Sequence, residues 1–301
     1  MENNKVKILD LDFVFISYRE PNCEENYADL LNKVPWAKRV HGVTGFDSAH
    51  KAAAELAETD FFISVDGDNI IDERFLLETL DWTKTDRKAV HRWRAKNNVN
   101  GLVYGNGGLV GWPKQTCLTM KTHENAETEE NRLDFCWGVP HENLHNCYSE
   151  TIINADKHQA FTAGYREGVK MCLDKGKPID AANFMRDIWP HNLKVLLTWM
   201  NVGADVEYGN FAMFGARMGC YQTVLETQAQ NINISDLDGM REVLLNYLDE
   251  DNIDADLLTY GESLKQRLDI PIANYSKEDS RFFKFVMPQH INKGVQDCEY
   301  K

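Results

Sequence analysis

Two carboxylates separated by one glycine are the side chains of this chain best suited to chemistry. Asp66-Gly67-Asp68 follows Phe61–Val65, a run of apolar and β-favouring residues typical of a strand buried on both faces. An open α/β sheet places its ligands at the carboxyl ends of strands. Paired carboxylates beside an apolar strand need a neutralising cation, and oxygen ligands suit Mg²⁺ or Mn²⁺ shared with phosphates. The pattern indicates a metal and nucleotide-diphosphate site, although Asp-Gly-Asp is also common in ordinary turns.

The residues before this strand predict a helix that leads into it. Asp47 is expected to cap a helix that runs through Ala57 and is followed by a short loop. His50 and Lys51 lie in its first turns, where Lys51 could reach a diphosphate as a point charge. A solvent-facing His-Lys pair on an amphipathic helix is the alternative. The predicted order is strand, helix, strand and Asp-x-Asp.

This order of elements resembles the nucleotide-sugar-dependent glycosyltransferases of the GT-A fold, whose donor diphosphate is held by a metal on an Asp-x-Asp. The resemblance covers about the first half of the chain. The Ala-His-Lys-x-Ala-Ala run that starts at Ala49, and Val65-Asp-Gly-Asp-Asn69, look closer to one branch of that fold. That branch contains the TET-associated and tailed-phage glycosyltransferases, which decorate hydroxymethylated pyrimidines in DNA.

The resemblance implies an α/β fold of the GT-A, Rossmann-like kind, with a mixed, mostly parallel sheet flanked by helices and a C-terminal helical region. Asp66 and Asp68 would hold Mn²⁺ or Mg²⁺ on a UDP-sugar donor, whose sugar would be arabinose or glucose. The acceptor would be 5-hydroxymethylcytosine or a related pyrimidine in duplex phage DNA. We therefore expect a hexosyl- or pentosyltransferase, such as an arabinosyltransferase, of the inverting type.

Two further segments are expected beside the donor. The first core strand, Asp12–Tyr18, ends where this fold opens its base and ribose pocket. Residues 105–108 are glycine-rich but lack the Lys-Ser/Thr ending and following helix of a phosphate loop, so they border the donor sugar or form a plain hairpin turn. The donor-contact candidates are Ser17, Tyr18, Arg19, Glu20, Asp47, His50, Lys51, Asp66, Gly67, Asn106, Gly107, Gly108 and Arg166.

An inverting transfer also needs a general base to take the acceptor proton. In similar enzymes this base is an Asp or Glu at or near a helix start after the last strand, which we expect at Leu133–Trp137. Glu167 is then the best-placed carboxylate, and Asp134, Glu142 and Asp187 are its rivals. Arg166 and Glu167 could equally form an ion pair on a helix surface.

The second half of the chain changes to helical periodicity. Apolar residues recur at helical spacing from Gln159 onward, and further helices are expected over 192–200, 210–228, 237–248 and 255–268, before an irregular tail. The sequence therefore predicts a nucleotide-sugar-binding core over residues 1–158 and a mostly helical, acceptor-side region over residues 159–301.

Charge and composition bound the partners. The net charge of -14 weighs against nucleic acid, but residues 84–96 form a concentrated basic segment that could serve as a cationic face. The 7 cysteines are scattered and fit reduced thiols, and the 9 histidines show no zinc-ligand spacing. Without a membrane-spanning run or a signal-like start, we expect a cytoplasmic protein, in the host cytoplasm if a phage encodes it.

Other functions remain open at the level of sequence. A GT-A enzyme with a saccharide or protein acceptor would explain the acidic charge without a cationic face. A nucleotidyltransferase would also use a carboxylate pair, but its glycine-rich, Arg/Lys-containing loop is replaced here by Ser17-Tyr-Arg-Glu-Pro21. A binding module without catalysis should lose little when Asp68 is changed to alanine.

Overall fold

The structure is a computed structural model that describes residues 4–105, 108–128, 131–132, 134–226, 237–247 and 252–294. The chain divides into two compact units, and each is described by itself. The first unit contains residues 1–97 and 103–152, and the second contains residues 98–102 and 153–301. The first unit ends at Ile152, one residue after the strand His141–Thr151. The sequence suggested a boundary after residue 158.

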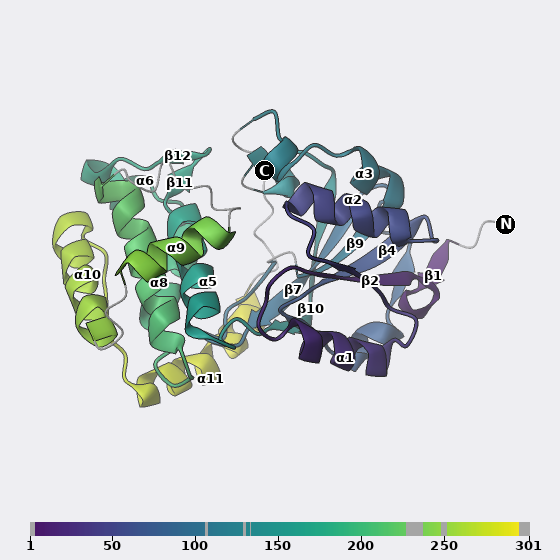
Figure 1. Ribbon diagram of the computed structural model, residues 1–301. Coiled ribbons are helices and arrows are strands. Elements are labelled where there is room, and N and C mark those ends of the chain that lie inside the picture. Colours follow the sequence, from purple (N-terminus) through teal and green to yellow (C-terminus); the bar gives the residue numbers. More distant parts are fainter. Residues whose placement is uncertain are drawn as a thin grey trace. The chain divides into compact units, whose positions relative to one another are not determined.

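The first unit is built on an 8-stranded sheet with the order β3-β2-β4-β9-β7-β10-β5, to which β8 adds by pairing with β7 (Figure 1). In chain order these strands are β2 (Asp12–Ser17), β3 (Lys38–His41), β4 (Phe61–Asp66), β5 (Asn69–Ile71), β7 (Val90–Asn97), β8 (Val103–Tyr104), β9 (Leu109–Pro113) and β10 (His141–Thr151). A separate two-stranded sheet pairs β1 (Lys5–Lys7) with β6 (Thr79–Asp81).

Strand directions make this sheet mixed. β3, β2 and β4 are parallel neighbours, and β7 and β10 form a second parallel pair. β9 runs antiparallel between β4 and β7, and β5 runs antiparallel to β10. Consequently β3, β2, β4, β7 and β10 point the same way. The predicted α/β class, a mixed sheet flanked by helices, is confirmed.

Helices lie on both faces of the sheet (Figure 1). α1 (Cys23–Lys33) covers one face, and α2 (Phe46–Leu56) and α3 (Lys114–Thr119) cover the other. α2 can approach the strands closely because Ala49, Ala53 and Ala54 form its buried side against Phe62 and Trp112. Small side chains on that side bring the start of α2 near the ends of β2 and β3.

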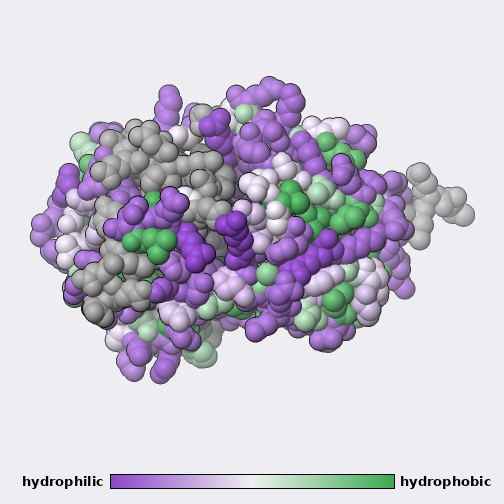
Figure 2. Space-filling model, viewed as in Figure 1, coloured by the Kyte–Doolittle hydropathy of each residue, from purple (hydrophilic) through white to green (hydrophobic). Residues whose placement is uncertain are grey.

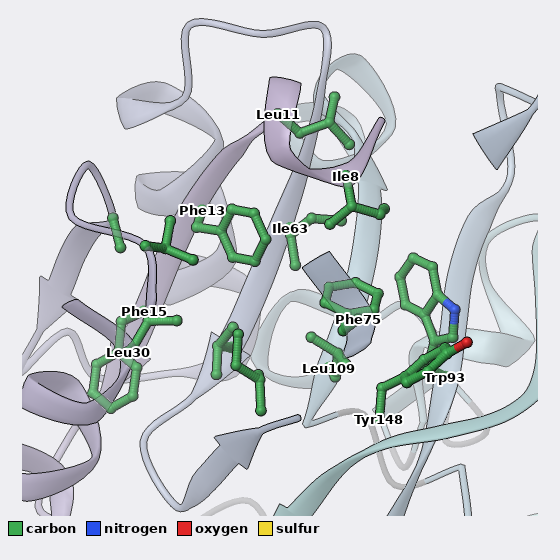
Figure 3. Packing of buried hydrophobic residues seen from close by; sticks show 14 of the residues in the cluster. Ile8, Leu11, Phe13, Phe15, Leu30, Ile63, Phe75, Trp93, Leu109 and Tyr148 are labelled. Carbon is green, nitrogen blue, oxygen red and sulfur yellow. The ribbon is translucent and has the colours of Figure 1, made fainter. Parts of the chain in front are cut away.

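The core confirms that the strand before Asp66 is buried on both faces. In β4, Phe61, Ile63 and Val65 belong to one apolar cluster, while Phe62 belongs to the cluster on the other face. Figure 3 shows the first cluster, in which the ring of Phe75 meets the edges or faces of its aromatic neighbours. Its ring centroid lies 6.2 Å from that of Phe13 and 4.8 Å from that of Trp93. Period-two alternation buries β4 on both sides, and its half-buried residue, Asp66, lies at the carboxyl end.

Some expected elements are wrong. Leu133–Trp137 was predicted as the last strand, but Phe135–Trp137 form a 3-10 helix that begins where the Asp134 carboxylate accepts a hydrogen bond from the N–H of Cys136 at 3.0 Å. The last strand of the sheet in chain order is β10. Residues 103–104 and 109–113 are two strands as expected, but they are not a hairpin, because β8 pairs with β7 and β9 lies between β4 and β7.

A short 3-10 helix, Glu73–Leu77, precedes β6. Asp72 ends the preceding extended segment by accepting a hydrogen bond from the N–H of Arg74 at 2.9 Å. This cap starts the 3-10 turn, and the pairing of β6 with β1 ends it. Other short 3-10 helices cover Ile8–Asp10, His123–Asn125 and Ala181–Asn183.

The second unit is mainly helical, as predicted. Its helices are α5 (Lys157–Lys170), α6 (Phe184–Asp187), α7 (Pro190–Asn201), α8 (Gly209–Tyr221), α9 (Leu237–Tyr247), α10 (Ile253–Leu268) and α11 (Lys277–Gly294). A π-helical turn, Gln222–Glu226, extends α8, and the short strands β11 (Leu173–Asp174) and β12 (Lys177–Pro178) form a two-stranded sheet.

Helices α5 and α8 approach until backbone touches backbone. A Cβ atom on Gly164 of α5 would lie 1.9 Å from the carbonyl oxygen of Ala212, and one on Gly215 of α8 would lie 2.3 Å from that of Phe161. Since neither carbonyl can move without distorting its helix, both positions require glycine.

Arg217 serves the packing of this unit. Its buried guanidinium donates hydrogen bonds to the carbonyl of Met200 at 2.8 and 3.0 Å, to that of Leu257 at 2.6 Å and to Oδ1 of Asn274 at 2.9 Å. Burial lowers the pKa of Arg217 to about 10. Its partners are two main-chain carbonyls and a side-chain amide, so the guanidinium anchors α8 to its own unit.

The tail after Leu268 was predicted to be irregular, but its residues 277–294 form the helix α11. α11 is fixed to its own unit by Lys284, whose Nζ lies 2.7 Å from a carboxylate oxygen of Asp205 and donates to the carbonyl of Val99 at 3.1 Å. These partners lie far away in the sequence, so the local pattern did not reveal them.

The described ranges contain no helix long and apolar enough to cross a membrane. Hydrophilic residues make up most of the molecular face shown in Figure 2, in keeping with a chain in which 27% of residues are charged.

Candidate functional site

The carboxyl ends of β2, β3 and β4 gather polar side chains at one edge of the sheet. Because these strands are parallel, Ser17 pairs with His41 and Ile16 pairs with Asp66 in register. The Ser17 hydroxyl lies 2.9 Å from Nδ1 of His41 and accepts a hydrogen bond from Nε of Arg39 at 3.0 Å. The topology therefore brings the end of the first core strand beside the start of Asp66-Gly67-Asp68, as the sequence predicts.

Three backbone hydrogen bonds hold this Asp-Gly-Asp turn. The N–H of Asp66 donates to the carbonyl of Gly108 at 3.0 Å, and the carbonyl of Asp68 accepts from the N–H of Ile152 at 2.7 Å. The carbonyl of Gly67 accepts from the side-chain amide of Asn26 at 2.9 Å. Gly67 is buried, whereas Asp66 and Asp68 are half-buried. The turn is thus fixed from β9, β10 and α1, while both carboxylates keep access to solvent.

Glu20 brings a third carboxylate to the turn. Its Oε2 accepts a hydrogen bond from the N–H of Tyr18 at 2.7 Å. A Cβ atom on Gly67 would lie only 2.7 Å from this oxygen and 3.0 Å from Cβ of Ser17. Arg19 is exposed, with its guanidinium carbon 5.1 Å from the Tyr18 ring centroid. Ser17 and Glu20, two of the predicted donor contacts, therefore lie against the Asp-Gly-Asp turn.

The donor set fits a hard divalent cation that shares a substrate's oxygens. Among the described residues, no group of three or more His, Cys, Asp and Glu side chains could hold a metal ion. Mg²⁺ is commonly bound through one or two carboxylates with substrate phosphates completing its shell. Half-buried Asp66 and Asp68 at a strand end match that pattern, so they are the residues that would hold such a metal.

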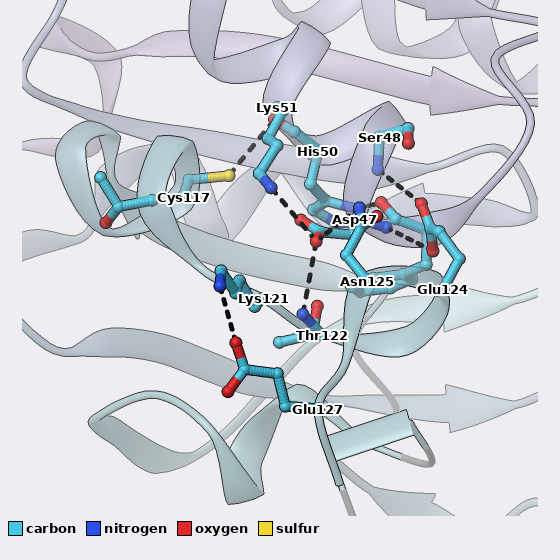
Figure 4. Close-up of polar contacts among 12 residues, drawn as sticks. Asp47, Ser48, His50, Lys51, Cys117, Lys121, Thr122, Glu124, Asn125 and Glu127 are labelled. Atoms are coloured by element: carbon cyan, nitrogen blue, oxygen red, sulfur yellow. Dashed lines mark hydrogen bonds and ion pairs between the residues drawn. The ribbon is translucent and has the colours of Figure 1, made fainter. Parts of the chain in front are cut away.

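The start of α2 differs from the prediction that Asp47 caps it. The N-cap residue is Gly45, and Asp47 is already the second residue of the helix. The free N–H groups of Asp47 and Ser48 donate to the carboxylate of Glu124 at 3.1 and 2.8 Å (Figure 4). Gly45 has a φ of +97°, and a Cβ there would overlap this carboxylate, at 2.2 Å from Oε1. A carboxylate from a distant loop therefore neutralises the helix N-terminus.

Asp47 and Lys51 form an ion pair within this cluster. Asp47 is fully buried, and one of its carboxylate oxygens lies 3.2 Å from Nζ of Lys51. The same oxygen accepts hydrogen bonds from the N–H of Thr122 at 3.3 Å and from the side-chain amide of Asn125 at 3.0 Å. Figure 4 shows these groups converging between α2 and the segment around Glu124. The Lys51 ammonium is thus engaged by a carboxylate of its own helix.

His50 is a core residue. Its ring is 2% exposed, stacks on Phe46 with centroids 4.0 Å apart, and donates from Nδ1 to the carbonyl of Phe46 at 2.9 Å. Burial lowers the pKa of His50 to about 4, so this ring is neutral near pH 7. A neutral, stacked imidazole stabilises α2 against the aromatic residues beneath it.

Asp134 and Glu142, two of the proposed bases, contact the basic strand β7. An oxygen of Asp134 lies 3.7 Å from Arg92, and Glu142 accepts a hydrogen bond from the N–H of Asp86 at 2.8 Å. Glu142 pairs in register with His91 near the beginning of two parallel strands. Asp66 lies at the carboxyl end of β4, which points the same way as these strands, so Glu142 lies at the opposite end of the strands. The structure therefore does not bring Glu142 to the Asp-Gly-Asp turn.

Three cations of the basic segment over residues 84–96 contact groups on β10. Arg92 donates from Nε to Asn143 at 3.0 Å, and Arg94 lies 3.1 Å from Nδ1 of His145. Lys96 lies 3.7 Å from a carboxylate oxygen of Glu150. Positive charge along β7 is accordingly balanced in part within the first unit.

Glu167 and Arg166 lie in the second unit, on α5. The predicted position of Glu167 near a helix start is wrong, because α5 begins at Lys157, where Asp156 caps it, and Glu167 lies in its last turn. The Glu167 carboxylate is 14% exposed and 3.7 Å from Nζ of Lys170, and Arg166 is half-buried. The sequence alternative was an ion pair between Arg166 and Glu167, but in the structure the ion pair of Glu167 is with Lys170.

The glycine-rich stretch is described only in part. Asn106 and Gly107, both expected near the donor sugar, lie outside the described residues. Gly108 is buried and borders the site through its carbonyl, which accepts from the N–H of Asp66.

Sequence reasoning missed four polar residues that fix the site: Asn22, Asn26, Asn69 and Thr151. All four are buried. Asn22 donates from its side-chain amide to the carbonyl of Ile152 at 3.0 Å. An available signal was the placement of asparagine at helix positions expected to face a sheet, since a buried polar side chain is expected to have a specific hydrogen-bond partner.

Comparison with known proteins finds a structural likeness and no match in sequence. No known protein family matches the sequence of this chain, and no curated protein does. Among solved structures, the chain is similar to the crystal structure of S. aureus TarS 1-349, with 13% identity and a TM-score of 0.32 over 85% of this chain and 91% of that one. A likeness of this size does not assign an activity.

Proposed function

We propose that this protein is a metal-dependent, inverting glycosyltransferase that moves a sugar from a UDP-sugar to 5-hydroxymethylcytosine or a related hydroxylated pyrimidine in duplex phage DNA. The sugar in this proposal is arabinose or glucose. The proposal rests on the chain's resemblance to nucleotide-sugar-dependent enzymes and on one structural observation, the arrangement of Asp66-Gly67-Asp68.

That observation is a carboxylate pair at the carboxyl end of β4, directly beside the end of its parallel neighbour β2. This is the edge at which open α/β sheets bind ligands. Asn26 and the Gly108 carbonyl fix the turn, so the carboxylates are positioned before any ligand arrives. Preorganised charges of this kind are more effective in catalysis than charges that must be ordered during the reaction.

In the proposed reaction, Asp66 and Asp68 bind the metal, and Ser17–Glu20 contact the nucleoside. A bound Mg²⁺ or Mn²⁺ would neutralise the diphosphate as it leaves. The acceptor hydroxyl forms a bond to the anomeric carbon while the bond from that carbon to the diphosphate breaks. A carboxylate takes the hydroxyl proton. Glu167 is the sequence candidate for that role.

The acceptor part of the proposal follows from the resemblance alone. A 5-hydroxymethyl group projects into the major groove and is accessible without extrusion of its base. The net charge of -14 and the pairing of β7 cations with β10 favour the alternative, an uncharged saccharide or a protein acceptor.

Mass spectrometry of nucleosides tests the donor and the acceptor together. The protein would be incubated with hydroxymethylcytosine-containing duplex DNA, Mn²⁺ or Mg²⁺, and a panel of UDP-sugars. We expect a mass gain of one pentose or one hexose on the modified base, lost in EDTA and in the Asp68→Ala variant. Unmodified duplex DNA is the matched acceptor control.

Hydrolysis of one UDP-sugar without any mass gain would move the acceptor to a saccharide or protein while keeping a glycosyltransferase. If the protein neither hydrolyses nor transfers the sugar of any donor in the panel, the proposal is overturned.

A further inference from the structure

Asn69 is a buried side chain directly beside the proposed metal site. It follows Asp68 and begins β5, where it pairs in register with Thr151, the last residue of β10. Its side chain is 2% exposed. A buried amide is retained at such a place only when specific partners satisfy it.

Both ends of the Asn69 amide have partners. Its Nδ2 donates to Oδ1 of Asp68 at 2.7 Å, and its Oδ1 accepts from the hydroxyl of Thr151 at 3.2 Å. A carboxylate can only accept, so the amide nitrogen must face Asp68. The hydroxyl of Thr151 favours the same orientation because it can donate to the amide oxygen. The two contacts therefore select one of the two amide orientations.

The backbone at Gly108 confines the same side chain. A Cβ atom on Gly108 would lie 2.1 Å from Nδ2 of Asn69, so the amide packs against bare backbone. The carbonyl of Gly108 in turn accepts the hydrogen bond from the N–H of Asp66. One amide thus contacts the Asp68 carboxylate, the end of β10 and the residue that holds Asp66.

We propose that Asn69 is a positioning residue that orients the Asp68 carboxylate for metal binding, with Thr151 fixing the orientation of the Asn69 amide. The inference rests on the proposed function, since it assigns Asn69 to that same metal site. Hydrogen bonds from neighbouring residues orient metal ligands, and loss of such a partner typically weakens metal affinity on the order of 10- to 100-fold.

A purely structural role would have a different consequence. If Asn69 only joined β5 to β10, its replacement would lower stability without changing metal affinity in the protein that remains folded. The experiment therefore needs a binding measurement on folded protein rather than activity alone.

Mn²⁺ binding in the presence of UDP provides that measurement. Free Mn²⁺ would be followed by electron paramagnetic resonance during titration of the wild-type chain and of the Asn69→Ala and Thr151→Val variants. Thr151→Ser keeps the hydroxyl and serves as the conservative variant. Asn146→Ala is the matched control, because Asn146 is an exposed asparagine on β10 whose amide donates to the Tyr148 hydroxyl at 3.0 Å, away from Asp68.

We expect Asn69→Ala to weaken Mn²⁺ binding on the order of 10- to 100-fold, and Thr151→Val to weaken it by less. Thr151→Ser and Asn146→Ala should bind Mn²⁺ as the wild-type protein does. UDP affinity measured in EDTA should stay the same in all variants, because the amide acts through Asp68. If Asn69→Ala fails to fold, the comparison of Thr151→Val with Thr151→Ser carries the test.

The two proposals fail in different ways. Suppose that the wild-type protein binds Mn²⁺ with UDP and that the folded variants at Asn69 and Thr151 bind it equally well. This result would overturn the role of Asn69 and leave the proposed function standing. Wild-type protein that does not bind Mn²⁺ with UDP would overturn the metal site itself.

Discussion

The side-chain amide of Asn26 donates a hydrogen bond of 2.9 Å to the main-chain carbonyl of Gly67, and both residues are buried. α1 thereby holds the Asp-Gly-Asp turn from one face of the sheet, 41 residues before it in the chain. The carbonyl is satisfied and the glycine between the two carboxylates is fixed.

Replacing Asn26 with alanine should leave this buried carbonyl without its donor. We expect a loss of about 1–3 kcal/mol in the free energy of unfolding, measured by urea denaturation, together with a fall in kcat/KM for transfer. Asn32→Ala is the matched control, since Asn32 is exposed on the same helix and its loss should leave both quantities close to wild type. Equal stability of the two variants would contradict a structural role for the Asn26 bond.

Asp66→Ala and Asp68→Ala should each abolish sugar transfer while the fold stays intact. Both carboxylates are half-buried at a strand end, so their removal creates no cavity and takes away the proposed metal ligands. Transfer rates and thermal melting would be measured side by side. Asp60→Ala removes an exposed carboxylate from the other end of β4 and should remain active. A fully active Asp68→Ala enzyme is incompatible with the metal site.

Glu124→Ala should destabilise the first unit by about 1–2 kcal/mol, because the N–H groups of Asp47 and Ser48 lose the carboxylate that caps α2. Glu124→Gln keeps an acceptor and should lose less. Glu127→Ala is the control, since Glu127 is exposed and forms an ion pair with Lys121 at 2.6 Å. Chemical denaturation of the three variants would show whether Glu124 is distinct from its neighbour.

Stability should fall as the pH drops from about 6.5 to about 4 through His50. Its pKa is 6.5 when unfolded and about 4 in the core, so the unfolded state binds the proton first. The stabilising contribution of the neutral ring amounts to about 3 kcal/mol. It is complete above pH 6.5 and is lost as the pH falls through the folded pKa. His91, whose pKa burial also lowers, acts in the same direction.

A His50→Phe variant isolates this contribution, because phenylalanine keeps an aromatic ring between Phe46 and Trp112 but does not titrate. The free energy of unfolding would be measured for both proteins across this pH range. We expect a shallower pH dependence for the variant. Parallel curves would contradict the burial of a neutral imidazole.

Gly164→Ala should separate α5 from α8. A methyl group would lie 1.9 Å from the carbonyl oxygen of Ala212, and the helix backbone cannot yield by that much. Overpacking of this kind typically costs about 1–3 kcal/mol and more where backbone must move. A melting temperature of the variant equal to that of the wild type would contradict this close contact between Gly164 and the carbonyl of Ala212.

Features that depend on local sequence patterns were predicted more successfully than features that depend on distant contacts. β4 and the turn after it were predictable because a fully apolar run followed by Asp-Gly-Asp is a local pattern. The helices α7, α8 and α10 were found for the same reason, through apolar residues at helical spacing. The tail at α11 was misjudged, since Lys284 acts through a distant partner, Asp205, that local propensity does not contain. The segment before β10 was misjudged although its signal is local, because Asp134 caps a 3-10 turn through the N–H of Cys136.

The sequence by itself determined the carboxylate pair, its place at a strand end and the α/β class, because side-chain type and periodicity suffice for these. Only the tertiary structure decided which groups surround that pair. Asn26, Asn69 and Thr151 come to the turn from α1, β5 and β10, and the last two are 82 positions apart in the sequence. Hydrogen bonds over such separations depend on strand order and register, which chain folding sets and a local pattern does not record.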